Sequence, residues 1–197
     1  MRTQDASYAE RRFRAESAWW KRLLDVQRPY RAHLQRLHLG LVLEIGCGIG
    51  RNLAHLRGTS IGVDRDRRAV KIAQARGLAA FTPEEFRASL WAAAGRFDAL
   101  LFSHVLEHMS AAEATALIRA HLHLLRADGR VVVLTPQEAG FRSDPTHVEY
   151  MDFEKVEAVL RGAGLEVQQQ YSFPLPRLAG AVFKYNEFVT IGCKRPH

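Results

Sequence analysis

One segment constrains the fold of this chain more than any other: an apolar run that ends in an acid and continues into alternating glycines. Residues 43–50 read Leu-Glu-Ile-Gly-Cys-Gly-Ile-Gly. Because glycine lacks a Cβ atom, such a segment can turn sharply and bring its backbone against a ligand. A strand that leads into a glycine-rich turn is typical of parallel sheets, where ligands bind beyond the carboxyl ends of the strands.

A second apolar run also ends in an acid, twenty positions after Glu44: Ser60-Ile-Gly-Val-Asp64. In dinucleotide-binding folds, an acid at the end of the second strand takes both hydroxyl groups of a ribose. The two acid-terminated runs together predict a nucleoside cofactor that lies across the ends of two adjacent parallel strands.

The spacing of the glycines indicates which cofactor this is. The dinucleotide fingerprint is G-x-G-x-x-G. Here the third glycine, Gly50, comes one residue early, and Arg51 occupies the fingerprint position. This departure disfavours a nicotinamide-dependent oxidoreductase of the Rossmann type, which we keep as an alternative.

The pattern Glu44-x-Gly46-x-Gly48-x-Gly50 instead resembles the first motif of the class I S-adenosylmethionine-dependent methyltransferases. Residues 97–109 (FDALLFSHVLEHM) look like that superfamily's fourth strand and following loop, and residues 125–134 (LRADGRVVVL) like its helix, glycine turn and fifth strand. The resemblance runs from about residue 38 to the end. It is nearest to the small-molecule branch that includes the ubiquinone-biosynthesis O-methyltransferases.

This resemblance implies an α/β fold: a Rossmann-like, doubly wound sheet of seven strands in the order 3-2-1-4-5-7-6, with the last strand antiparallel and helices on both faces. It also implies an enzyme that transfers a methyl group from S-adenosyl-L-methionine to a small-molecule acceptor, with oxygen as the favoured target atom. The residues expected to bind the cofactor are Glu44, Gly46, Cys47, Gly48, Gly50, Asp64, Arg65, Phe81, Thr82 and Ser103. Relatives often carry an Asp after the third strand to pair with adenine. This chain has Ala-Phe81-Thr82-Pro there, so Phe81 could stack on the base and Thr82 could pair with it.

Alternating apolar and helical stretches support the same architecture, because repeated β-α units imply a parallel sheet covered by helices on both faces. We expect strands near residues 41–46, 60–63, 78–81, 97–102, 130–134, 164–171 and 187–193. Helices are expected over 110–126 and 152–162, and another should begin at Pro83 with Thr82 as its cap. The last two strands lack a clear intervening helix, which is consistent with an antiparallel hairpin.

Candidate catalytic residues follow the fourth strand, where the reacting group of the cofactor is expected. His104 is the best candidate for a general base, because an unperturbed imidazole titrates near neutral pH. Glu107 and His108 follow at spacings of three and four, which one helical turn would place on one face with His104. His147 lies in the long loop after the fifth strand, over the same cleft.

These four residues, His104, Glu107, His108 and His147, also suggest a divalent metal site, because imidazoles and a carboxylate can bind such an ion. Some class I branches, including the small-RNA 3′-end methyltransferases, use an E-x-x-E-H motif with a distant histidine as metal ligands. This chain matches the Glu-His pair and the distant histidine but has His104 in place of the first glutamate. The alternative, favoured here, is that the histidines orient the loop by hydrogen bonds without metal.

Composition narrows the remaining possibilities. No apolar run approaches the roughly 20 residues that a membrane-spanning helix needs, and no signal-peptide pattern is present at the N-terminus, so a cytoplasmic protein is expected. The net charge of +7 keeps open an RNA methyltransferase, possibly metal-assisted, although dense basic runs and aromatic-basic RNA motifs are absent. The sequence gives no oligomeric state.

We expect two parts in the chain. Residues 1–38 form an amphipathic helical extension with Phe13, Trp19 and Trp20 among its apolar residues, and this extension could close as a lid over the cofactor cleft. Residues 39–197 form the cofactor-binding domain.

Overall fold

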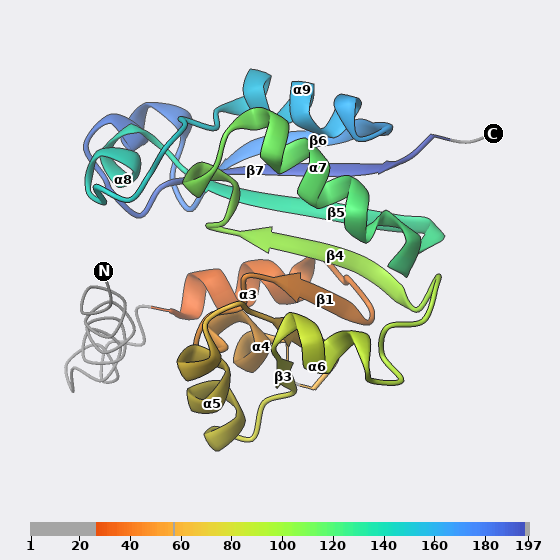
Figure 1. The fold of residues 1–197 in the computed structure, drawn as a ribbon. Coiled ribbons are helices and arrows are strands. Elements are labelled where there is room, and N and C mark those ends of the chain that lie inside the picture. Colours follow the sequence, from red (N-terminus) through yellow and green to blue (C-terminus); the bar gives the residue numbers. More distant parts are fainter. Residues whose placement is uncertain (1–26, 57, 196–197) are drawn as a thin grey trace.

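The fold is built on one seven-stranded sheet in the order β3-β2-β1-β4-β5-β7-β6 (Figure 1). The computed structural model describes residues 27–56 and 58–195. The strands are β1 (Val42–Ile45), β2 (Ser60–Val63), β3 (Ala80–Phe81), β4 (Phe97–Ser103), β5 (Leu125–Pro136), β6 (Leu165–Phe173) and β7 (Glu187–Lys194). β7 runs antiparallel to both of its neighbours, β5 and β6, whereas the pairs from β3 to β5 are parallel. The predicted strand order and the antiparallel last strand are confirmed.

The central strands are apolar on both faces, as expected for parallel strands covered by helices. Alternate residues of these strands enter two different clusters of buried side chains. Leu43, Leu100 and Phe102 belong to one cluster. Val42 and Leu101 belong to the other, on the opposite face of the sheet. This period of two explains why a continuous apolar run forms a strand buried on both sides.

The helices are α3 (Arg28–Arg36), α4 (Arg51–His55), α5 (Arg67–Ala75), α6 (Pro83–Arg87), α7 (Ala111–His121), α8 (Glu138–Arg142) and α9 (Phe153–Gly162), with 3₁₀ turns at η1 (Leu106–His108), η2 (Leu122–Leu124) and η3 (Arg177–Ala181). Buried side chains of α6, α7 and α9 pack in the first cluster, and Leu34 of α3 packs in the second. Figure 1 shows α7 and α9 lying together beside β5 and β7. Both faces of the sheet are therefore covered.

The structure corrects several of the expected element boundaries. The helix expected over 110–126 ends at His121, and β5 already begins at Leu125, which pairs with Phe97. The register then shifts, so that Ala99 pairs with Arg130. A Cβ atom on Gly129 would lie 2.5 Å from a methyl group of Leu125, so a glycine is required in this irregularity. The third strand is shorter than expected and covers only Ala80–Phe81.

The predicted cap of the helix that begins at Pro83 is confirmed. Thr82 caps α6, accepting a hydrogen bond from the Glu85 N–H, while the Glu85 carboxylate accepts one from the Thr82 N–H. This capping box stabilises the start of the helix. α9 begins at Phe153, one residue later than expected, because Asp152 serves as its cap.

The expected N-terminal extension is only partly within the described residues. Phe13, Trp19 and Trp20 lie outside them. The described part, α3, places Leu34 against the sheet, in contact with the cluster that contains Leu101 and Val132. Within the described residues, the structure contains no helix of sufficient length and apolar character to cross a membrane.

Candidate active site

The glycine turn after β1 is made of three left-handed residues. Gly46, Gly48 and Gly50 have φ angles of 76°, 55° and 81°. A Cβ atom at Gly46 would lie 2.4 Å from Val105, and one at Gly50 would lie 2.5 Å from Leu78, whereas one at Gly48 would meet nothing within 4 Å. Packing against the protein therefore requires glycine at 46 and 50. A side chain at Gly48 would instead point into open space, where a ligand can approach.

Asp64 follows β2 and is bonded to this turn. One carboxylate oxygen accepts a hydrogen bond from the Gly48 N–H at 2.7 Å, and the other accepts one from the Asp66 N–H at 2.8 Å. A carboxylate has about four lone-pair positions, so both oxygens can still accept further hydrogen bonds. The arrangement presents a fixed acceptor pair at the carboxyl ends of β1 and β2, as the sequence predicted.

Glu44, in β1, lies beneath the turn and is only 2% exposed. Oε1 of its carboxyl group accepts a hydrogen bond from the Asn52 amide at 2.7 Å, but Oε2 has no hydrogen-bond partner among the described residues. Burial raises the pKa of Glu44 to about 8, against the opposing effect of the Asn52 hydrogen bond. An unpaired buried oxygen of this kind is costly unless a ligand group reaches it. The site therefore suits a ligand that carries a cationic or hydrogen-bond-donating group.

The other expected cofactor residues surround this centre. Cys47 is buried, with its N–H bonded to Val63, and burial raises the pKa of its thiol. Ser103 is buried at the end of β4, and Phe81 is partly buried at the end of β3. The Thr82 hydroxyl serves the capping box, and Arg65 is exposed. Their contacts with adenine or methionine stay predictions.

His104 lies directly after β4 in a left-handed conformation, with φ of 56°. Its Nε2 lies 2.8 Å from Oε1 of Glu187, and its Nδ1 lies 3.2 Å from Oε1 of Glu107. Burial alone would lower the pKa of His104, but the adjacent carboxylates of Glu187 and Glu107 outweigh burial and raise this pKa to about 9. At neutral pH the His104 side chain is therefore an imidazolium, and each of its two ring nitrogens faces a carboxylate.

Glu107 also belongs to a second group of polar residues, together with His108 and His147. One potential ligand atom from each of the three lies within 4.8 Å of the others. The two imidazole rings are 4.9 Å apart between centroids. The single helical turn expected to align His104 with Glu107 and His108 is instead a short 3₁₀ turn that begins at Leu106. The structure nevertheless brings all four predicted polar residues together.

These residues border a cavity of about 240 Å³. His104, His108 and His147 line it, together with several residues that were not expected there from the sequence: Tyr30, Arg51, Lys184, Tyr185 and Glu187. The Tyr30 hydroxyl donates a hydrogen bond to the Tyr185 carbonyl at 2.7 Å, which joins α3 to the loop before β7. Glu187 could have been recognised from the sequence as a candidate site residue, because it is a carboxylate at the start of a mainly apolar run, Phe188–Ile191.

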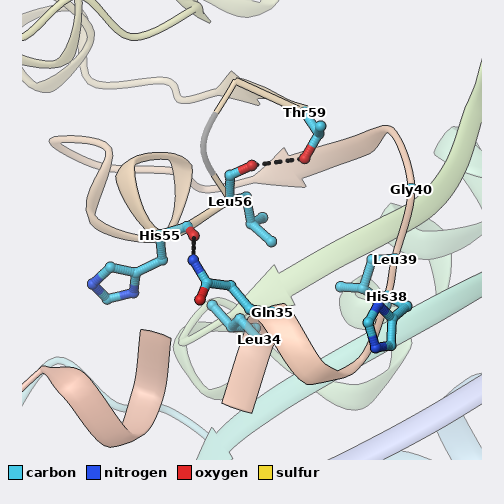
Figure 2. Close-up of a pocket in the computed structure, with 8 residues that line it drawn as sticks. All are labelled: Leu34, Gln35, His38, Leu39, Gly40, His55, Leu56 and Thr59. Atoms are coloured by element: carbon cyan, nitrogen blue, oxygen red, sulfur yellow. Dashed lines mark hydrogen bonds between the residues drawn. The ribbon is translucent and has the colours of Figure 1, made fainter. Parts of the chain in front are cut away.

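A larger cavity, of about 460 Å³, lies elsewhere in the molecule. Figure 2 shows its lining by the end of α3, the end of α4 and the segments that lead into β1 and β2. Gln35 donates a hydrogen bond to the His55 carbonyl at its rim, and Leu34, Leu39 and Leu56 supply apolar walls. It lies at the amino ends of β1 and β2, so it is separate from the glycine turn and Asp64 at their carboxyl ends.

Comparisons with known proteins place this site in a family context. A family model described as "Methyltransferase domain" matches residues 8–170, most of the chain. No curated protein sequence matches the chain.

Solved structures share its fold. A TehB-like S-adenosylmethionine-dependent methyltransferase from Corynebacterium glutamicum has a TM-score of 0.66 and 17% identity, covering 96% of this chain and 100% of that chain. Magnesium protoporphyrin IX methyltransferase from Synechocystis, solved with bound S-adenosylhomocysteine, has a TM-score of 0.64 and 16% identity, covering 98% of this chain and 95% of that chain. A methyltransferase from Archaeoglobus fulgidus has a TM-score of 0.62 and 18% identity, covering 90% of this chain and 100% of that chain. At these identities the likeness shows the fold.

Proposed function

This chain belongs to the methyltransferase-domain family, and from that premise we propose that it transfers a methyl group from S-adenosylmethionine to an oxygen atom of a small-molecule acceptor. The main observation in favour of this cofactor is the hydrogen bond from the Gly48 N–H to the Asp64 carboxylate. There an open backbone turn and a fixed carboxylate lie side by side at the ends of two parallel strands. The solved Synechocystis methyltransferase of the same fold, with S-adenosylhomocysteine bound, supports this choice of cofactor.

The residues of this site fit the chemical groups of the cofactor. The Asp64 carboxylate would hold the ribose hydroxyls, because each of its oxygens has accepting capacity beyond its bond to a backbone N–H. The unpaired, buried Oε2 of Glu44 lies under the same turn, and a positively charged part of the ligand beside it would stabilise the ionised form of this carboxyl group. Gly48 leaves room for the ligand to lie directly against the backbone.

S-adenosylmethionine supplies an electrophilic methyl group on a sulfonium, whose departure needs little further help. The protein's own residues therefore serve chiefly to position the acceptor and to receive its proton. Glu187 and His104 form the hydrogen-bonded pair that lines the cavity. We assign the acceptor's proton to this pair: the Glu187 carboxylate can accept it, and the adjacent imidazolium stabilises negative charge that develops on the acceptor oxygen. A direct base role for His104 would first require it to release a proton to a neighbouring carboxylate.

The cavity favours a small acceptor over RNA. Its volume of about 240 Å³ is below that of typical drug-sized ligand pockets. Its walls mix cationic Arg51 and Lys184 with Glu187 and the Tyr30 hydroxyl, so it suits a polar molecule with a hydroxyl group. The RNA alternative rested on the net charge of +7, part of which comes from residues 1–26, outside the described residues.

The lid function expected for residues 1–38 remains a proposal, and α3 supplies its support. Tyr30 of this helix lines the cavity and donates a hydrogen bond to the carbonyl of Tyr185, which also lines it. Closing or opening this contact would alter access to the acceptor site. Tyr30→Phe, which removes only the hydroxyl, should raise KM for the acceptor while leaving S-adenosylhomocysteine affinity unchanged.

The function is tested by methyl transfer itself. The purified chain would be incubated with methyl-labelled S-adenosylmethionine and a set of small phenols and hydroxy acids, and labelled products would be identified by mass spectrometry. We expect an O-methylated product whose formation is abolished by excess S-adenosylhomocysteine. Label appearing only on nitrogen or carbon would contradict the assignment to oxygen, and label in RNA would contradict the small-molecule assignment.

A further inference from the structure

We infer that Glu107, His108 and His147 form a binding site for a divalent transition-metal ion beside the acceptor cavity. One potential ligand atom from each lies within 4.8 Å of the others, close enough for a single ion to reach all three. Two imidazoles and one carboxylate form a donor set typical of Zn²⁺ sites with an open position. Mg²⁺ prefers ligands that are all oxygen, so this set favours Zn²⁺, Fe²⁺ or Mn²⁺ over Mg²⁺.

Glu107 supplies the observation that most directly requires a ligand. Its side chain is fully buried, at 0% exposure. Neither carboxylate oxygen has a hydrogen-bond partner among the described residues, although Oε1 lies 3.2 Å from Nδ1 of His104. A buried carboxylate oxygen without a partner is destabilising. A bound cation would satisfy it.

The backbone holds the two halves of this group together. The Glu107 carbonyl accepts hydrogen bonds from the N–H groups of Val148 at 2.7 Å and Glu149 at 3.2 Å. The 3₁₀ turn that carries Glu107 and His108 is therefore bonded directly to the loop that carries His147. This connection keeps the three side chains near one another without an ion, as a site with fixed geometry requires.

Both imidazoles are oriented in the manner of metal ligands. Nδ1 of His147 lies 2.7 Å from the Phe141 carbonyl, and Nδ1 of His108 lies 3.2 Å from the Thr146 carbonyl. Because a carbonyl oxygen can only accept, each Nδ1 donates its hydrogen, and each Nε2 keeps a lone pair. Histidines that bind metals usually donate their other ring N–H to a carbonyl or carboxylate in this way.

His104 is excluded from the ligand set by its own contacts. Its two ring nitrogens face the carboxylates of Glu107 and Glu187. The proposed site therefore has three ligands, Glu107, His108 and His147, rather than the four residues expected from the sequence. His104 becomes a positioning residue that lies beside the Glu107 carboxylate, 3.2 Å from its Oε1.

Three protein ligands leave coordination positions open, and His108 and His147 also line the acceptor cavity. An acceptor hydroxyl or phenol bound at an open position would lose its proton more readily, because a divalent ion stabilises the oxyanion. This role rests on the proposed function, whereas the binding of the ion does not.

The test is a calorimetric titration of Zn²⁺ into the chelator-treated full chain. Elemental analysis after gel filtration then gives the amount of Zn²⁺ bound per chain. We expect about one Zn²⁺ per chain, with affinity at least ten times weaker in His147→Ala and in Glu107→Gln. His123→Ala is the matched control, because it removes an exposed imidazole whose Nδ1 lies 3.0 Å from the Ala120 carbonyl, away from the site. Its Zn²⁺ affinity should equal that of the wild type.

Two outcomes would overturn the inference: no stoichiometric Zn²⁺ in the wild type, or equal Zn²⁺ affinity in the wild type and His147→Ala. Mg²⁺ binding as tightly as Zn²⁺ would also contradict the assigned donor set. Because His147 lies on a loop, His147→Ala is expected to fold, and it tests the site even if Glu107→Gln does not fold. S-adenosylhomocysteine is titrated into the same variants. Retained cofactor binding with lost Zn²⁺ binding supports the ion site, whereas Zn²⁺ binding without any cofactor binding would contradict the proposed function alone.

Discussion

The Gly48 N–H donates a hydrogen bond to the Asp64 carboxylate at 2.7 Å, so the turn after β1 and the acid after β2 are joined directly. Parallel pairing of the two strands, with Ile45 opposite Val63, brings these segments to the same edge of the sheet. The carboxylate is thus held in place by the backbone before a ligand arrives. Such preorganisation reduces the entropy lost when a ligand binds.

Asp64→Ala should weaken binding of S-adenosylhomocysteine by about 1.5–3 kcal/mol, the scale for hydrogen bonds to a charged group. Titration calorimetry measures this loss. Asp66→Ala is the control, because Asp66 is a nearby acid whose side chain caps α5 through the Arg68 N–H. It should reduce stability by about 1 kcal/mol without changing cofactor affinity. Equal affinity in Asp64→Ala and the wild type would remove the ribose role.

Gly48→Ala should abolish most cofactor binding while the protein still folds. Its Cβ atom would meet no protein atom within 4 Å, so the folded state pays only the backbone strain of a left-handed alanine, about 1–2 kcal/mol. The new methyl group would occupy the space that the ligand needs. Gly95→Ala is a close match, with φ of 62° and likewise nothing within 4 Å, but it lies between α6 and β4. Thermal unfolding should show similar losses for both variants, and only Gly48→Ala should lose binding. Equal cofactor affinity in the two variants would contradict a ligand at this turn.

Stability should depend on pH through Glu44. Its pKa is raised from 4.5 to about 8 in the folded protein, so between these values the folded state keeps a proton that the unfolded state has released. Stability therefore falls as pH rises through this window, by at most about 1.4 kcal/mol per pH unit from this group. Glu44→Gln keeps an acceptor for Asn52 but cannot ionise. Urea unfolding at pH 5.5, 6.5 and 7.5 should show a stability difference between variant and wild type that grows with pH, in favour of the variant. A constant difference would show that Glu44 is ionised when folded.

His104→Ala should lower methyl transfer by about 10²–10⁴-fold, the range for loss of a group that assists proton transfer. Affinity for S-adenosylhomocysteine should stay near that of the wild type, because the partners of His104 are Glu107 and Glu187 rather than the glycine turn. Glu187→Gln, made in parallel, should give a loss of similar size because the two residues act as a pair. Full turnover in His104→Ala on the true acceptor would mean that the enzyme acts by proximity alone.

The sequence was sufficient for the sheet order and for placing the glycine turn and Asp64 at the same edge of the sheet. Acids that end apolar runs, at Glu44 and Asp64, mark strand ends directly, and β-α alternation orders the parallel strands. The capping box at Thr82 was readable because caps depend on residues only three positions apart. These signals are local or periodic, so one sequence contains them.

The cavity lined by His104 and Glu187 depends on long-range contacts that no local pattern encodes. Glu187 reaches His104 across 83 positions because antiparallel β7 returns beside β5, and Tyr30 reaches Tyr185 across 155 positions. The effect of Glu187 on the pKa of His104 could not be anticipated from the sequence either. From the sequence, His104 carried an ordinary imidazole pKa; two carboxylates brought together by the fold raise it.

The central claim is that the Gly48–Asp64 junction binds S-adenosylmethionine, and a paired calorimetric titration with S-adenosylhomocysteine and NAD⁺ tests it most directly. We predict saturable binding of one S-adenosylhomocysteine per chain, lost or strongly weakened in Asp64→Ala, and no measurable binding of NAD⁺ at the same concentrations. Tighter binding of NAD⁺ than of S-adenosylhomocysteine would contradict the account and favour the nicotinamide-dependent alternative.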